Sequence, residues 1–148
     1  MSKRWATPTW YFLHVLIEKI DAVQYKRISK EYIDLMVNIF NNLPCPHCKT
    51  HAVSYSKKNN IYAMNTRALM KQYMFDFHNH VNKNIGKRLQ NNKIYDLYSK
   101  MNTVYVCNLF IRQFFLTNPL SQQFNGWQSN LKQIIVGFLN KNKSYLRV

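Results

Sequence analysis

The feature that most constrains the fold is the recurrence of apolar residues every three or four positions. Trp10, Leu13, Ile17 and Ile20 follow this spacing, and a longer stripe of the same kind runs through residues 28–42. Such a spacing places side chains on one face of an α-helix. The chain also has only 3 Gly and 4 Pro against 47% hydrophobic residues, which disfavours a β-sandwich rich in tight turns. We therefore expect an all-α fold.

Capping residues and prolines indicate helix boundaries in the first half of the chain. Thr7 can cap a helix whose first position is Pro8, because the N–H that proline lacks is not needed there. A second helix is expected over 28–42 and should end at the prolines of the segment LPCPHC. The same prolines favour a new helix start, with Cys48 in its first turn.

The second half of the chain contains similar signals. The polar stretch 56–66 is expected to be a loop, and Thr66 can cap a long helix that reaches about Asn84, with Gly86 at its C-terminal end. The apolar face of this helix is expected to carry Leu69, Tyr73, Phe77 and Val81. Further helices are expected near 93–101, 103–116 and 127–139, with a connection at Pro119–Gly126. We expect a compact helical bundle at residues 1–100 and a C-terminal helical extension at 101–148.

The segment Cys45-Pro46-His47-Cys48 holds two of the three cysteines of the chain. At a helix start, the free backbone N–H groups and the helix dipole stabilise a thiolate, and cysteine pKa values there can fall to roughly 3.5–7.5. A two-residue spacer also lets the two sulfurs close into a reactive disulfide. This pattern is typical of a thiol–disulfide exchange site.

Other uses of the cysteine pair compete with this interpretation. Zinc needs four ligands, and these could come from Cys45, Cys48, His51 and one of His78 or His80. Haem attachment requires a histidine directly after the second cysteine, where Lys49 stands. A thioredoxin-like protein can carry the same tetrapeptide, but its fold surrounds the motif with strands, whereas the flanks here are helical.

The net charge of +15 raises the question of nucleic-acid binding. The basic residues are scattered, and the chain is rich in Lys, Asn, Ile and Tyr together, which share A/T-rich codons. We therefore expect no specific nucleic-acid partner. The alternative to a redox enzyme is a non-enzymatic basic helical adaptor, with or without a zinc ion that stabilises it. The apolar stretch 103–116 contains Asn108 and Arg112 and is too short to span a bilayer. We find no pattern of a signal peptide.

A dithiol that generates disulfides repeatedly needs an electron acceptor, which in a helical bundle means a bound cofactor. The segment FHNHVNKNIGKR (77–88) offers imidazole and amide groups followed by cations. These groups suit a nucleotide with a diphosphate, but they could equally form a polar helix end.

Three blocks of the sequence, in order, resemble the Erv/ALR-type FAD-linked sulfhydryl oxidases, particularly the short forms encoded by large double-stranded DNA viruses. WATPTWYFLH (5–14) is similar to the N-terminal W-x-x-L-H helix of that family. CPHCKTHAVSY (45–55) carries the CxxC, and HNHVNKNIGK (78–87) is close to the signature H-N-x-V-N-x-x-x-G-K. The resemblance spans residues 5 to about 98.

The resemblance implies a four- or five-helix bundle around FAD, with the isoalloxazine beside the CxxC. It implies that Cys48 is the flavin-proximal sulfur and Cys45 the outer, interchange sulfur. The positions that match FAD contacts are Trp10, His14, His78, Asn79, Val81, Asn82, Lys83 and Lys87, joined by Trp5, His51, Tyr55 and Tyr95, which match mainly the viral branch. Trp10 could also be a core residue, as could the aromatic residues at 73 and 77.

The same resemblance implies an FAD-dependent thiol oxidase that introduces disulfide bonds into partner proteins and passes electrons to O2, giving hydrogen peroxide. Family members usually dimerise, and the viral forms imply a location in the host cytoplasm or the virion. Unlike many cellular members, this chain has only one further cysteine, Cys107, so it has no internal shuttle disulfide. Substrate thiols, or a dithiol redox carrier, are expected to reach Cys45 directly.

Two regions depart from the family pattern. Thr7-Pro8 stands where the family often has Gly-Arg, and residues 103–148 have no counterpart that we can align. Cys107 lies in an apolar run, where a buried inert thiol is favoured over an intermolecular disulfide. The stripe of Trp127, Leu131, Ile134 and Phe138 is expected to pack on the bundle or to form a dimer interface.

Overall fold

The structure, a computed structural model, describes residues 4–116 and 125–148, with the side chains of 4–115 and 130–148. Its α-helices are α1 (Ala6–Lys19), α2 (Ala22–Phe40), α3 (Pro46–Lys58), α4 (Arg67–Asn84), α5 (Ile94–Lys100), α6 (Thr103–Leu116) and α7 (Asn125–Asn142). The described residues also form two short 3-10 helices, η1 (Ile61–Ala63) and η3 (Lys143–Tyr145). Within the described residues the only β-type pairing is an isolated bridge between Ile20 and Leu146. The all-α fold that we expected is confirmed.

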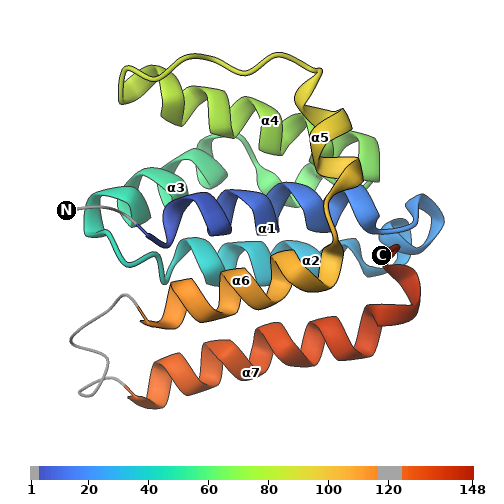
Figure 1. Cartoon of the computed structure of the whole chain (residues 1–148). Helices are drawn as coiled ribbons and strands as arrows, with labels where there is room; N and C mark the ends of the chain where they lie inside the picture. The colour runs from blue at the N-terminus through green and yellow to red at the C-terminus, as the bar shows by residue number, and fades with distance from the viewer. Residues whose placement is uncertain (1–3, 117–124) are drawn as a thin grey trace.

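Helix α1 is the centre of the bundle. It packs against α4, α5 and α6, while α2 packs against α3, α4 and α7 (Figure 1). In this view α4 lies on one side of α1, and α6 and α7 lie on the other side. The stacked rings of Phe12 and Phe110, 4.2 Å apart and both fully buried, join α1 to α6. The bundle therefore buries α1 on several sides, which leaves α3 and α4 to form an outer surface.

Helix α1 begins earlier than its sequence indicated. Trp5 is the N-cap, and the Thr9 hydroxyl donates to the Trp5 carbonyl oxygen over 2.6 Å. The expected cap at Thr7 was wrong, since Thr7 lies inside the helix. Pro8 is tolerated as the third helical residue because the first backbone N–H groups of a helix have no intrahelical partner.

Helix α2 begins at Ala22, six residues before the start that we expected. Asp21 is the reason, because its carboxylate accepts hydrogen bonds from the backbone N–H groups of Val23 and Gln24, over 2.9 and 3.1 Å. The predicted start at residue 28 was wrong, because it relied on the apolar stripe, which begins at Ile28. The fully buried Tyr25 already belongs to the helix.

The Asp21 cap allows a direct test of this helix start. Replacing Asp21 by alanine leaves two backbone N–H groups without their acceptor, and we expect a loss of about 1 kcal/mol in the free energy of unfolding. Asp21→Asn keeps a side-chain oxygen at the cap and should retain most of that stability. Urea unfolding of both variants measures the difference, and equal losses for the two would contradict the capping role.

The expected signals around α4 are confirmed. The Thr66 hydroxyl accepts from the Leu69 backbone N–H over 3.2 Å, and Gly86 follows the helix with a φ of +72°. The loop expected at 56–66 is partly wrong, because α3 continues to Lys58 and η1 occupies Ile61–Ala63. Leu69 was expected on the apolar face but is 45% exposed.

An ion-pair cluster holds α4 against α1. Glu18, almost fully buried, lies 2.8 Å from the Lys71 ammonium and 3.5 Å from the Arg67 guanidinium. The Glu18 carbonyl oxygen also accepts from Arg67 and Arg147. These contacts fix the position of α4, which carries most of the residues that resemble the cofactor signature.

The C-terminal segment returns to the bundle. Leu131, Ile135 and Phe138 of α7 are buried, whereas Ile134 is 37% exposed, so the expected stripe was wrong by one position at Ile134. The side chain of Trp127 lies outside the described residues, as does most of the expected connection, although Asn125-Gly126 already belongs to α7. No helix in the described part of the chain is long and apolar enough to cross a membrane.

Candidate active site

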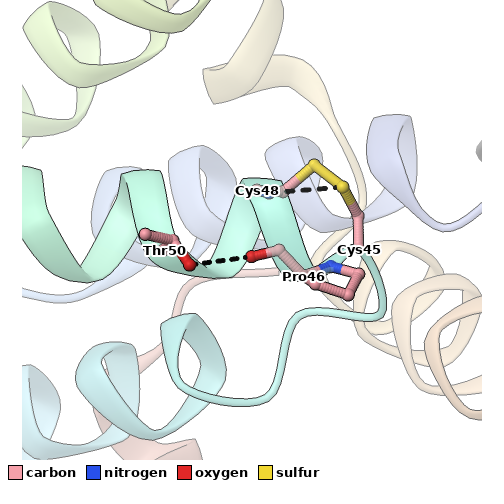
Figure 2. Close-up of a disulfide and its surroundings, with 4 residues drawn as sticks. All are labelled: Cys45, Pro46, Cys48 and Thr50. Atoms are coloured by element: carbon pink, nitrogen blue, oxygen red, sulfur yellow. Dashed lines mark hydrogen bonds between the residues drawn. A yellow bond between two sulfur atoms is a disulfide. The ribbon is translucent and has the colours of Figure 1, made fainter.

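A disulfide between Cys45 and Cys48 lies at the start of α3 (Figure 2). Cys45 is the N-cap, Pro46 occupies the first helical position, and the Thr50 hydroxyl donates to the Pro46 carbonyl oxygen over 3.1 Å. The expectation that the motif lies at a helix N-terminus, with Cys48 in the first turn, is confirmed.

In this N-cap, one of the two sulfurs accepts a hydrogen bond from the backbone. The Cys48 backbone N–H donates to Cys45 Sγ over 3.2 Å. Such a donor stabilises negative charge on the sulfur that accepts it, as does the positive end of the helix dipole. Both cysteines are partly exposed, so a partner thiol can approach the pair. The arrangement is suited to thiol–disulfide exchange.

A cleft of about 520 Å³ lies between α3 and α4. It is lined by His51, Ser54, Tyr55, Lys58, Asn59, Asp76, Asn79, His80, Lys83 and Leu89. Four of these, His51, Tyr55, Asn79 and Lys83, are residues whose pattern matched cofactor contacts. The cleft therefore combines an aromatic ring, amide groups and cations, which are the groups that a nucleotide cofactor requires.

Histidines connect this cleft to the disulfide. The rings of His51 and His47 are 6.5 Å apart, and His47 lies between the two cysteines. The Asn84 amide nitrogen is 3.1 Å from His51 Nε2, and the rings of His51 and His80 are 5.0 Å apart. Partial burial lowers the pKa of His51, and the neighbouring His80 and His47 lower it further. This shift favours the uncharged imidazole. His51 follows Cys48 by three positions, so one end of the cleft lies within one helical turn of Cys48.

The half-buried Trp10 forms an aromatic stack with the buried side chains of His14, His78 and Tyr98. His14 Nε2 lies 2.9 Å from His78 Nδ1, a hydrogen bond between α1 and α4. The Trp10 ring stacks on His78 at 3.8 Å, and Tyr98 stacks on His14 at 4.5 Å. Burial lowers the pKa of His14 to about 3, with His78 contributing, and lowers that of His78 to about 4, with Lys87 contributing. Both imidazoles are therefore neutral at physiological pH.

Asn79 and Asn82 hold the loop that follows α4. The Asn79 side chain donates to the Gln90 carbonyl oxygen over 2.9 Å and accepts from the Gln90 N–H over 2.8 Å. The Asn82 amide donates to the Arg88 carbonyl oxygen over 3.3 Å. The Lys87 N–H donates to the Asn82 carbonyl oxygen over 2.8 Å. These bonds fix the backbone of the loop that carries Lys87 and Leu89 beside the cleft.

Three further residues that matched cofactor contacts, Trp5, Val81 and Tyr95, lie outside the lining of the cleft. Val81 is half-buried and packs on the core, and Trp5 caps α1. The Tyr95 hydroxyl donates to the Lys71 carbonyl oxygen over 3.3 Å, and the Lys71 ammonium lies 4.6 Å from the ring centre. None of these three residues lines the cleft.

Sequence reasoning missed several residues of the site. A second cleft of about 430 Å³ adjoins the first and shares Tyr55, Lys58, Asn59 and Asp76 with it. The hydroxyl of Tyr73, which lines this second cleft, is buried without a hydrogen-bond partner. Helical spacing could have found these residues, because Lys58 and Asn59 follow Tyr55 by three and four positions. His80, which is exposed, also lines the first cleft.

The zinc alternative requires ligands that the structure uses elsewhere. Cys45 and Cys48 are joined to each other, and His78 bonds to His14. Among the residues that the structure describes, no group of three or more His, Cys, Asp or Glu side chains is arranged to hold a metal ion.

A disulfide at a helix start, next to a cleft of aromatic, amide and basic groups in an all-α bundle, is an arrangement suited to a helical thiol–disulfide exchange protein. The Erv1 / Alr family model matches residues 7–104, and the chain belongs to this family. The resemblance noted in the sequence is confirmed.

Two relatives come from isolates of African swine fever virus, and each is named as an FAD-linked sulfhydryl oxidase. The protein of isolate Pig/Kenya/KEN-50/1950 is 35% identical over 86 residues, which cover 57% of this chain and 71% of the relative. That of isolate Tick/Malawi/Lil 20-1/1983 is 31% identical over 85 residues, with the same coverage. No solved structure gives a significant match.

Proposed function

We propose that this protein is an FAD-dependent thiol oxidase that introduces disulfide bonds into partner proteins. Membership of the Erv1 / Alr family and the names of the viral relatives support this proposal. The observation that carries it is the Cys45–Cys48 disulfide at the start of α3, one helical turn from a cleft lined by Tyr55 and Lys83. We further propose O2 as the electron acceptor, with hydrogen peroxide as its product.

The exchange chemistry follows from the position of the two cysteines. A substrate thiolate attacks Cys45 Sγ, the Cys45–Cys48 bond breaks, and Cys48 leaves as a thiolate at the positive end of α3. The second substrate thiol loses its proton and attacks the mixed disulfide, so Cys45 leaves. The Cys48 N–H that donates to Cys45 Sγ stabilises this leaving sulfur. The substrate has then lost two electrons, which reside in the Cys45–Cys48 dithiol.

The residues around the cleft fit FAD. When bound, FAD accepts an electron pair from the dithiol and makes it available to O2. Tyr55 offers a ring for stacking, and Asn79 offers a polar side chain. Lys58 and Lys83 offer positive charge for a diphosphate. The aromatic stack of Trp10, His14 and His78 lies outside the lining of this cleft, and its contact with the flavin is proposed from the family pattern.

The proposed function is tested by the stoichiometry of oxygen use. The purified full chain, supplied with FAD and dithiothreitol, is expected to consume one O2 and to form one H2O2 for each dithiol oxidised. Catalase should return half of the oxygen. Disulfide exchange without oxygen consumption would contradict the oxidase, and inactivity in both assays would favour a non-enzymatic adaptor.

Asn79 offers a test of the cofactor cleft. Asn79→Ala removes both side-chain bonds to Gln90 and frees the loop beside the cleft, and we expect FAD to bind at least about tenfold more weakly, a change of about 1.4 kcal/mol. Asn108→Ala, an exposed amide on α6, is the matched control and should keep wild-type affinity. Equal affinities for the two variants, measured by flavin fluorescence, would contradict the role of Asn79.

The proposal also covers the domain organisation, the oligomeric state, the substrates and the location of the protein. Residues 1–100 would form the cofactor-binding bundle, and 101–148 an extension. We propose a homodimer that acts on thiol proteins or on a dithiol carrier, in the host cytoplasm or the virion. The viral relatives support this setting.

A further inference from the structure

The redox disulfide lies in a part of the chain that is almost free of carboxylates. Between Asp34 and Asp96 the sequence has nine lysines and arginines but only one acidic residue, Asp76. Helix α3 itself carries three lysines and no acidic residue. This imbalance is local, because the six acidic residues of the chain lie mostly on α1, α2 and α5.

The fold gathers cations around the start of α3. Asn84 at the end of α4 lies 3.1 Å from His51 Nε2, so the end of α4 lies beside the first two turns of α3. This contact brings the segment 83–88 next to the disulfide-bearing helix. We define the basic collar as four exposed residues of these two segments: Lys49, Lys83, Lys87 and Arg88.

The charges of the collar are not neutralised by carboxylates of the described residues. Elsewhere, Lys71 pairs with Glu18, Lys30 with Asp34, and Lys141 with Glu31. Within residues 4–115 and 130–148, no member of the collar forms an ion pair. Helix α5, which carries Asp96, lies at the opposite side of the molecule from the start of α3 (Figure 1).

We propose that the basic collar selects thiol proteins whose reactive cysteines are flanked by aspartate or glutamate. This inference rests on the proposed oxidase function and names the substrate class of the same site. A positive patch around a reactive group raises the local concentration of anionic partners and accelerates their encounter. If the diphosphate of FAD engages Lys83 and Lys87, the exposed Lys49 and Arg88 are still available to attract the substrate. The bond exchange itself is that described above.

The test compares two dithiol peptides with the same Cys-Xaa-Xaa-Cys centre, one flanked by glutamates and one by lysines. At low ionic strength we expect kcat/KM for the glutamate peptide to exceed that for the lysine peptide at least about tenfold, and added salt to reduce the ratio. Lys49→Glu and Arg88→Glu should each lower this ratio severalfold. Lys132→Glu on α7, an equal change in net charge at an exposed position, should leave it unchanged. The ratio cancels any effect of a variant on the intrinsic reactivity of the disulfide.

Dithiothreitol, which is uncharged, separates the two levels of the proposal. Turnover of dithiothreitol without discrimination between the peptides would overturn the role of the collar and leave the oxidase intact. No turnover of any dithiol would overturn the oxidase itself. Equal rates for the peptides, together with duplex DNA binding that Lys49→Glu abolishes, would assign the collar to nucleic acid instead.

Discussion

Replacing Cys48 by serine is expected to reduce dithiol-dependent oxygen consumption to the uncatalysed rate. Serine cannot form the bond to Cys45 that a substrate thiolate must break, so no electron pair can enter the site. Cys45→Ser should have the same effect on turnover. Both variants should keep the fold, because the cysteines are partly exposed and the other contacts of α3 are retained. Oxygen-electrode rates with dithiothreitol measure the loss, and circular dichroism checks the fold.

Cys107→Ser is the matched control for these variants. Cys107 is half-buried on α6, and burial raises the pKa of its thiol to about 11, so it is almost entirely protonated at neutral pH and a weak nucleophile. We expect this variant to oxidise dithiols at the wild-type rate. A large loss of activity in Cys107→Ser, or retained activity in Cys48→Ser, would contradict the assignment of the redox pair.

The stability of the fold is expected to fall steeply as the pH drops below about 6.5. His14 and His78 have pKa values of about 3 and about 4 in the folded chain, against an ordinary value of 6.5. Between these values the unfolded chain binds protons that the folded chain does not, so acid favours unfolding. The stabilisation is complete above pH 6.5 and is lost as the pH falls toward 4. With two such groups the slope approaches about 2.7 kcal/mol per pH unit.

A series of urea unfolding curves between pH 7.5 and pH 5 measures this slope. His78→Gln removes one of the two groups and should reduce the slope by roughly half. Asn108→Ala, a change at an exposed and non-titrating side chain on α6, should leave the slope as in wild type. A slope in His78→Gln equal to that of wild type would show that the buried pair is not the source of the pH dependence.

Local sequence signals predicted the helices well where a single residue decides the backbone. Thr66 caps α4 and Gly86 takes a positive φ after it, as expected from each residue alone. The start of α2 was missed, because the cap at Asp21 precedes a polar first turn in which only Tyr25 is buried. The apolar stripe therefore predicted the buried face of α2 more reliably than the residue at which α2 begins.

The candidate site was less accessible to sequence reasoning, because its contacts are not local. The hydrogen bond between His14 and His78 joins residues 64 positions apart, and no local pattern indicates it. Tyr98, which stacks on His14, belongs to a helix outside the motif blocks. By contrast, Tyr55 and Lys83 matched family positions, and the structure places both along the same cleft.

The most direct test of the central claim is the visible absorption spectrum of the purified full chain, before and after addition of dithiothreitol. We predict a flavin band that bleaches when dithiol is added without oxygen and returns when air is admitted. A colourless protein that takes up no flavin on incubation with FAD would contradict the account. So would a bound flavin that dithiol leaves unbleached.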